Sequence, residues 1–179
     1  MGYGLFMDNA KLINQDSGNV EYYTPTWIVE AAREVMGSID LDPASSAKAN
    51  LTVKASTYYR LPFNGLDYEW FDNVWLNHPF SKAQNKAWIN KLINEYEVDS
   101  NVKQACCITY ASTSEKWFQP LMNYPQCYFS RRVNYIDGVT GNIKKGVTKG
   151  SVVTYLGPNV AKFYSVFSQY GKVMVPYGY

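Results

Sequence analysis

The sequence predicts an α/β fold with a mainly parallel central sheet. Short apolar runs typical of buried strands alternate with stretches whose apolar residues recur at helical spacing. At 179 residues the chain is long enough to bury a core without a metal or disulfide. The polar, irregular residues 1–20 are expected to form a flexible arm, which leaves a single domain over residues 21–179.

The expected elements follow this alternation along the chain. Thr24 is suited to cap a helix that has Pro25 in its first turn and ends at Gly37. Ser38 to Leu41 then reads as a short buried strand. Further strands are expected over residues 74–76, 102–110, 128–129, 133–136, 151–156 and 172–175, with helices over 87–96, 117–122 and 160–170.

Composition excludes several classes of protein. The N-terminus lacks the basic and apolar pattern of a signal peptide, and no apolar run is long enough to span a membrane, so we expect a cytoplasmic protein without a membrane partner. The three cysteines, Cys106, Cys107 and Cys127, form no Cys-x-x-Cys pair, so neither a metal site nor a disulfide is expected. A net charge of +2 does not by itself demand a nucleic-acid partner. The 16% of aromatic residues fits either a stacking surface or a tyrosine-rich core.

A polar turn, Asn77-His78-Pro79-Phe80, ends the strand expected at 74–76. The Asn77 side chain and a neighbouring backbone carbonyl can receive two hydrogen bonds from one exocyclic amino group. Proline fixes such a turn, and Phe80 can stack on a base extruded from a duplex. A plain turn with a capping Asn and a core Phe explains the same four residues.

Asp42 ends another expected strand, 35 positions earlier in the chain than Asn77. Parallel sheets bind ligands at the carboxyl ends of their strands, so the loops at Asp42 and Asn77 are expected to converge.

Six motifs together resemble the phage-type DNA adenine-N6 methyltransferases, the Dam-like family, from about Glu21 to Val175. They are Glu21-Tyr22-Tyr23-Thr24-Pro25, Asp40-Leu41-Asp42-Pro43-Ala44-Ser45, Asn64-Gly65-Leu66, Asn77-His78-Pro79-Phe80, Arg132-Val133-Asn134-Tyr135-Ile136 and Lys149-Gly150-Ser151-Val152-Val153. The resemblance implies a compact Rossmann-like methyltransferase sandwich. It also implies S-adenosylmethionine-dependent methylation of the exocyclic N6 amine of adenine in DNA, by direct transfer to a flipped base in a duplex.

The resemblance also assigns site residues, and the chain departs from the family pattern at two of them. The implied catalytic residues are Asn77, His78, Pro79 and Phe80, and the implied cofactor-binding residues are Tyr23, Thr24, Pro25, Asp40, Asp42, Pro43, Ala44, Ser45 and Asn64. His78 stands where the family has a proline, and Asn64 where it usually has an acid. His78 is then a general base, a structural hydrogen-bonding group or a solvent-facing replacement. The carbonyl of residue 78, which would accept the second hydrogen bond of the amine, survives the substitution.

A basic, glycine-rich segment follows in the C-terminal half. Arg131, Arg132, Lys144, Lys145 and Lys149 are candidate phosphate contacts, with residues 137–150 as a DNA-contacting insert. A solvated lysine-bearing hairpin is the alternative interpretation.

Alternative functions also stay open at this level: a catalytically decayed DNA-binding protein of the same fold, or a methyltransferase acting on RNA or protein. The resemblance suggests a phage or prophage origin and a connection to restriction-modification. The recognised DNA site and the oligomeric state are not predicted.

Overall fold

The computed structural model describes residues 22–80 and 83–179, so the arm expected over residues 1–20 lies outside the described residues. A seven-stranded sheet organises the chain, in the order β3-β2-β4-β5-β8-β6-β9. Its strands are β2 (Leu41–Asp42), β3 (Thr57–Tyr58), β4 (Asp72–Leu76), β5 (Val102–Tyr110), β6 (Gln126–Phe129), β8 (Ser151–Leu156) and β9 (Gly171–Met174).

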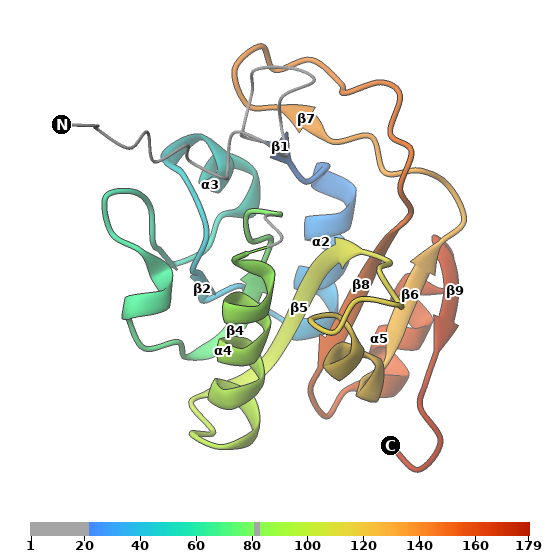
Figure 1. Cartoon of the computed structure of the whole chain (residues 1–179). Coiled ribbons are helices and arrows are strands. Elements are labelled where there is room, and N and C mark those ends of the chain that lie inside the picture. The colour runs from blue at the N-terminus through green and yellow to red at the C-terminus, as the bar shows by residue number, and fades with distance from the viewer. Residues whose placement is uncertain (1–21, 81–82) are drawn as a thin grey trace, which may run out of the picture.

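The sheet is mixed, which corrects the expectation of a mainly parallel one. Strands β3, β2, β4 and β5 pair in parallel, whereas β8 is antiparallel to both β5 and β6, and β9 is antiparallel to β6. After β6 the chain makes a long excursion and returns as β8 between β5 and β6 (Figure 1). Strand direction is set by such connections and not by the apolar pattern of the strand, so periodicity alone could not predict it.

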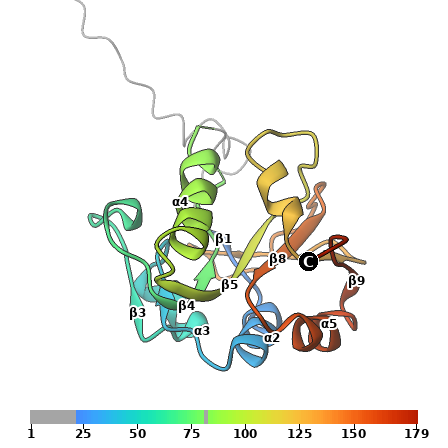
Figure 2. The ribbon, with the colours of Figure 1, turned by 90° about the horizontal axis from the view of Figure 1, so that it is seen from below.

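Helices cover both faces of the sheet and make a three-layer sandwich (Figure 2). The α-helices of the described residues are α2 (Thr26–Met36), α3 (Ala47–Val53), α4 (Asn85–Glu97) and α5 (Val160–Phe167). Successive residues of a strand point to opposite faces, so Trp75 and Cys106 join the buried cluster beneath α2 and α5, while Leu76 and Cys107 join the cluster beneath α4. Among the described residues, no helix is long and apolar enough to cross a membrane.

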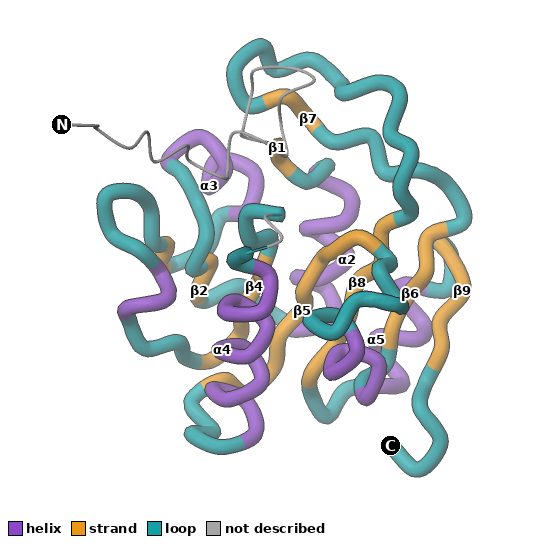
Figure 3. Tube along the Cα trace, in the orientation of Figure 1, coloured by secondary structure: helices purple, strands orange, loops and turns teal. Residues whose placement is uncertain are grey.

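The strands expected over residues 102–110 and 151–156 are confirmed, but several other elements differ from expectation (Figure 3). The helix expected near residue 117 is the short 3-10 helix η2 (Gln119–Asn123). The strand expected at 133–136 shrinks to β7 (Ile136–Asp137). Strand β7 pairs antiparallel with β1 (Tyr22–Tyr23), outside the main sheet.

The cap expected from Thr24 is wrong. Pro25 occupies the N-cap position of α2, and no side chain caps that helix end. Thr24 is instead buried, with a hydroxyl that has no hydrogen-bond partner among the described residues.

Candidate active site

The parallel strands bring the expected site residues to one edge of the sheet. Leu41 of β2 pairs with Val74 of β4, so Asp42 and Asn77 follow neighbouring strands at their carboxyl ends. Tyr110 ends β5 at the same edge, because β4 and β5 are also parallel. The β1/β7 pair lies beyond this edge, as Figure 1 shows.

Asn77 is half-buried and is tied to β1. Its side-chain nitrogen donates to the backbone carbonyl of Tyr22 at 3.5 Å. This contact joins residues 55 positions apart. Because the side-chain nitrogen of Asn77 is engaged by this hydrogen bond, the side-chain oxygen is the group suited to accept a hydrogen bond from an amine.

His78 is enclosed by aromatic rings. It is 1% exposed, and its ring lies parallel to that of Trp88 at 6.3 Å between centroids. The rings of Phe80 and Trp117 approach it edge-on at 5.5 and 6.5 Å. The solvent-facing alternative for His78 is therefore wrong.

The hydrogen bonding of His78 sets its tautomer. Nδ1 lies 3.0 Å from the Pro79 carbonyl oxygen, which can only accept, so Nδ1 carries the proton. Nε2 has no partner among the described residues. Burial lowers the pKa of His78 to about 4, with the Pro79 hydrogen bond opposing that shift, so the ring is neutral near pH 7. This arrangement supports the structural hydrogen-bonding interpretation, because Nδ1–H holds the Pro79 carbonyl within the turn.

Phe80 faces the end of β5. Its half-buried ring lies 4.7 Å from that of Tyr110, with the two planes tilted by 43°. Pro79, between the two rings of the turn, is exposed. The turn therefore presents an amide and an aromatic ring at the same edge of the sheet.

Asp42 is a buried carboxylate at the end of β2, only 2% exposed. It accepts from the backbone N–H of Ala44 at 3.2 Å and from the Ser45 hydroxyl. Burial nevertheless raises the pKa of Asp42 to about 7, because these two hydrogen bonds only partly offset the desolvation. No salt bridge to Asp42 occurs within residues 22–80 and 83–179. A carboxylate in this state is stabilised by any cationic group that comes to lie beside it.

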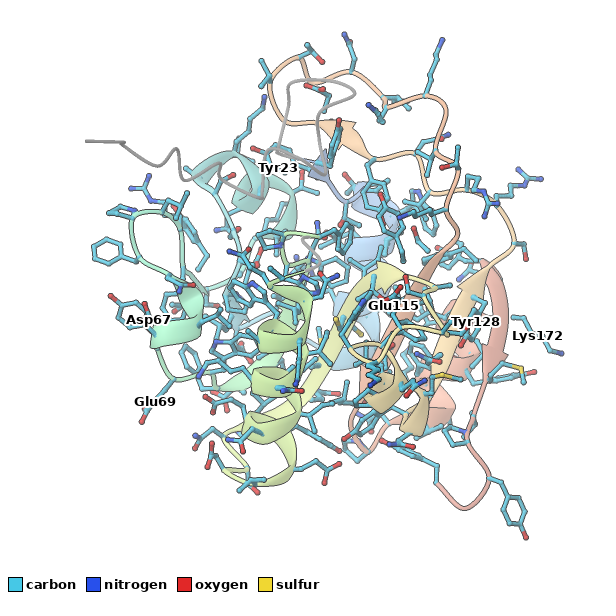
Figure 4. The ribbon with its side chains drawn as sticks, viewed as in Figure 1. Tyr23, Asp67, Glu69, Glu115, Tyr128 and Lys172 are labelled. Atoms are coloured by element: carbon cyan, nitrogen blue, oxygen red, sulfur yellow. The ribbon has the colours of Figure 1, made fainter. Side chains whose placement is uncertain are left out.

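The loop after Asp42 is held on two sides. The Tyr23 hydroxyl lies 3.1 Å from the hydroxyl of Ser46, which caps α3 by accepting from Ala49 N–H at 3.0 Å. Tyr23 is labelled in Figure 4 beside α3. On the other side Gly65 presses against Pro43, where an added Cβ would lie 1.9 Å from the carbonyl oxygen. The loop Pro43-Ala44-Ser45 is therefore shaped by residues from β1 and η1 (Gly65–Asp67).

Two of the expected cofactor-binding residues use their side chains locally. Asp40 accepts from the Asn73 backbone N–H at 3.1 Å and from the Ser38 hydroxyl at 3.2 Å, which ties the approach to β2 to the start of β4. Asn64 caps η1 by accepting from the Leu66 N–H at 3.2 Å. Within the part of the chain that the structure describes, neither side chain hydrogen-bonds to Asp42 or Asn77.

Comparison with known families decides the affiliation of this chain. A model of the DNA N-6-adenine-methyltransferase (Dam) family matches residues 14–173. The chain belongs to this family. No curated protein matches the chain. The family is one of DNA adenine methyltransferases, so DNA is the implied substrate and S-adenosylmethionine the implied methyl donor.

The basic residues of this Dam-family chain divide into two groups. Lys144 and Lys149 lie beside the site, with their ammonium groups 5.2 Å from the centroid of the Tyr22 ring and 5.4 Å from that of Tyr110. Arg131, Arg132 and Lys145 are exposed. The arginines follow β6, which runs parallel to β5 through their shared antiparallel neighbour β8, so they emerge at the same edge of the sheet.

Residues 137–150, the expected DNA-contacting insert, are partly ordered by pairing. The Gly141 N–H donates to the Asp137 carbonyl at 2.8 Å, and Ile136 bridges to Ile143 to form a short hairpin on β1. Lys48 of α3 also donates to the Gly138 carbonyl. The hairpin is therefore attached to the side of the site that carries the loop after Asp42.

Sequence reasoning missed an aromatic groove of about 440 Å³ next to this loop. It is lined by Tyr58, Tyr59, Arg60, Phe63 and Tyr68. Backbone bonds connect it directly to the Asp42 loop: the Tyr59 N–H donates to the Asp42 carbonyl at 3.0 Å, and the Ser45 N–H to the Tyr59 carbonyl at 2.9 Å. The signal available in the sequence was the density of aromatic residues between positions 58 and 68.

Proposed function

We propose that this protein methylates the N6 amine of adenine in DNA, by direct transfer from S-adenosylmethionine to a flipped base. The observation that carries the proposal is the placement of Asp42 and Asn77 at the ends of two neighbouring parallel strands, in a chain of the Dam family. When bound, the cofactor supplies an electrophilic methyl group.

The residues around Asp42 fit such a cofactor. The buried Asp42 carboxylate, without a cationic partner among the described residues, would accept hydrogen bonds from the α-ammonium of the cofactor. The hydroxyl of Thr24, which has no hydrogen-bond partner among the described residues, would donate to the carboxylate of the same methionine portion, next to Pro25. Tyr23 would hold the Ser46 end of the loop in place.

The rest of the cofactor is assigned to the neighbouring groove. Its aromatic rings suit a flat adenine, since Tyr59 and Tyr68 already pack with centroids 5.0 Å apart. Pro43, Ala44 and Ser45 would enclose the cofactor between the groove and Asp42. Asp40 and Asn64 would support the site through the contacts they make in the chain.

The catalytic turn would orient the target amine. The Asn77 side-chain oxygen and the His78 backbone carbonyl would each accept one hydrogen of the amine, which directs its lone pair away from the ring plane. The bond from Asn77 to Tyr22 supports this role, because it engages the nitrogen of the amide. Phe80 would stack on the adenine, and the neutral His78 ring would hold the Pro79 carbonyl.

The basic residues would position the DNA. Arg131, Arg132, Lys144, Lys145 and Lys149 are proposed to contact phosphates around the flipped base. These residues and Asn77 lie at the same edge of the main sheet, which supports the proposal. A base that reaches Asn77 must bring its flanking phosphates to that edge.

The test is expression in a bacterial host that lacks adenine methylation, followed by mass spectrometry of its digested DNA. We expect N6-methyladenine with the wild-type protein and none above background with Asn77→Ala, since the amine loses its side-chain acceptor. Asn90→Ala is the matched control, because Asn90 is an exposed residue of α4 and its loss should leave the signal unchanged.

Calorimetry with S-adenosylmethionine separates the alternatives. Wild-type protein that binds the cofactor but yields no methyladenine would overturn the proposal in favour of another acceptor, such as RNA or protein. Wild-type protein that neither binds cofactor nor methylates, yet binds DNA, would favour the decayed DNA-binding protein.

A further inference from the structure

A cluster of two tyrosines and two lysines borders the catalytic turn. It consists of Tyr22, Tyr110, Lys144 and Lys149, and is called the tyrosine–lysine cluster below. The ring centroids of Tyr110 and Phe80 lie 4.7 Å apart, and the backbone carbonyl of Tyr22 accepts a hydrogen bond from the side-chain nitrogen of Asn77 at 3.5 Å. Both tyrosines therefore touch residues of the turn that is proposed to hold the target base.

Each tyrosine ring has a lysine ammonium over it. Lys144 lies 5.2 Å from the centroid of Tyr22, and Lys149 lies 5.4 Å from that of Tyr110. Both distances are within the roughly 6 Å over which a ring face attracts a cation. Lys144 also acts on Tyr110, whose pKa is raised chiefly by burial and next by Tyr22, while Lys144 lowers it.

The fold holds these lysines near the rings from both ends of their segment. The Ala111 N–H donates to the Gly150 carbonyl at 2.9 Å, which fixes the chain next to Lys149 against the residue after Tyr110. The Lys144 N–H donates to the Tyr135 carbonyl at 2.7 Å, and the Tyr135 hydroxyl lies 2.9 Å from that of Ser151. These hydrogen bonds fix the backbone of both lysines near the rings, while their long side chains remain able to change rotamer.

Two properties of DNA match this arrangement. An extruded base presents a flat π-face that stacks on an aromatic ring, and its flanking phosphates attract ammonium groups more strongly than a neutral ring does. The ring face beneath each ammonium would become accessible when the lysine turns toward a phosphate.

We propose that Tyr110 and Tyr22 bind the extruded purine beside Phe80, and that Lys144 and Lys149 move from these ring faces to the phosphates flanking it. The inference rests on the proposed function and adds two base-binding residues to it. It also makes exposure of the stacking surface depend on DNA, so the free protein keeps its ring faces covered.

The tyrosine half is tested by steady-state kinetics, with labelled S-adenosylmethionine and genomic DNA from a host without adenine methylation. Tyr110→Ala should lower kcat/KM for DNA by about tenfold, the size expected for losing one base–aromatic stack. Tyr110→Phe, which keeps the ring, should stay within about twofold, on the same stacking argument. The Kd for S-adenosylmethionine should be unchanged in both.

Tyr110→Leu guards against a folding artefact, because it keeps an apolar contact with Phe80 but cannot stack on a base. It should match Tyr110→Ala in kcat/KM while unfolding at the wild-type temperature. Wild-type activity in either the Ala or the Leu variant would overturn the tyrosine half.

The lysine half is tested by the salt dependence of duplex binding, with Lys172→Gln as the matched control. Lys172 is exposed on β9 at the far end of the sheet order and lies at the outer edge in Figure 4. The double variant Lys144→Gln/Lys149→Gln should reduce the slope of log K against log salt by about 1.8, because each phosphate that the protein no longer neutralises lowers the slope by about 0.9. Lys172→Gln should leave the slope unchanged, and an equal slope in the double variant would overturn the lysine half.

These outcomes are distinct from failure of the proposed function. A wild-type protein that does not methylate adenine would overturn both ideas. A wild-type protein that methylates adenine, with Tyr110→Ala equally active, would overturn this inference alone.

Discussion

Replacing Asp42 with asparagine should stabilise the cofactor-free protein while removing a carboxylate that is proposed to bind the cofactor. Asp42 is 2% exposed, and burial raises its pKa from 3.8 to about 7. The folded state therefore holds the Asp42 proton more tightly than the unfolded state does. The resulting penalty on stability is absent well below pH 3.8, grows as pH rises between the two values, and is complete above about pH 7.

The pKa values set the size of this penalty. With a folded-state pKa of about 7 against 3.8 unfolded, and about 1.36 kcal/mol per pH unit, ionised Asp42 costs about 4 kcal/mol at pH 8. At pH 5 the same linkage leaves a cost of about 2 kcal/mol. A buried amide has a desolvation cost of its own, so Asp42→Asn should gain about 2 to 4 kcal/mol at pH 8.

Urea unfolding of both proteins at pH 8 and pH 5, without cofactor, measures this difference. The advantage of Asp42→Asn should shrink by about 2 to 3 kcal/mol between pH 8 and pH 5. Its Kd for S-adenosylmethionine should rise by at least about tenfold, because the ammonium loses a charged acceptor. Asp40→Asn is the control and should give no gain, because the Asp40 carboxylate accepts hydrogen bonds from Asn73 and Ser38. An Asp42→Asn protein no more stable than wild type at pH 8, or a pH-independent difference, would refute the reasoning.

Three further predictions follow from individual contacts. His78 is the one histidine of the chain, so its ring proton is directly assignable by NMR. With a pKa of about 4, the ring should show no titration between pH 5.5 and 8. A titration midpoint near 6.5 would contradict the enclosure of the ring. Gly65→Ala should lower the free energy of unfolding by about 1 to 3 kcal/mol in urea, because its Cβ would lie 1.9 Å from the Pro43 carbonyl oxygen; an unchanged value would mean that the loop adjusts freely. Phe63→Ala should weaken S-adenosylmethionine binding by about tenfold in calorimetry if the groove stacks on the adenine, whereas Leu61→Ala on the same loop should not, and equal affinities would remove the groove from the site.

The success of sequence reasoning varied with how local each signal is. The strands at 102–110 and 151–156 were predicted to the residue because a largely apolar run, buried over most of its length, has well-defined ends. The α-helix expected over residues 117–122 was wrong, because the four apolar residues that suggested it fit a short 3-10 helix equally well. Thr24 also failed as a cap, because Pro25 takes the N-cap position and the Thr24 side chain is buried.

Family membership and the position of the turn Asn77 to Phe80, which is proposed to be catalytic, came from the sequence alone. The turn Asn77 to Phe80 is recognisable from the types and order of its residues. A strand that ends before a proline is also a local property of the chain. The convergence of Asp42 and Asn77 was also predictable, because the carboxyl ends of neighbouring parallel strands share one edge.

Only the tertiary structure decided the environment of those residues. The mixed sheet depends on where the chain returns after β6, and the pairing of β1 with β7 brings Tyr22 to Asn77 across 55 positions. His78 is enclosed by Trp88 of α4 and by Trp117 beyond β5, and the shifted pKa of Asp42 comes from its burial in the folded chain. Burial and electrostatic environment are sums over all neighbours in space, so the pKa values and contacts that define this site could not be obtained from sequence order.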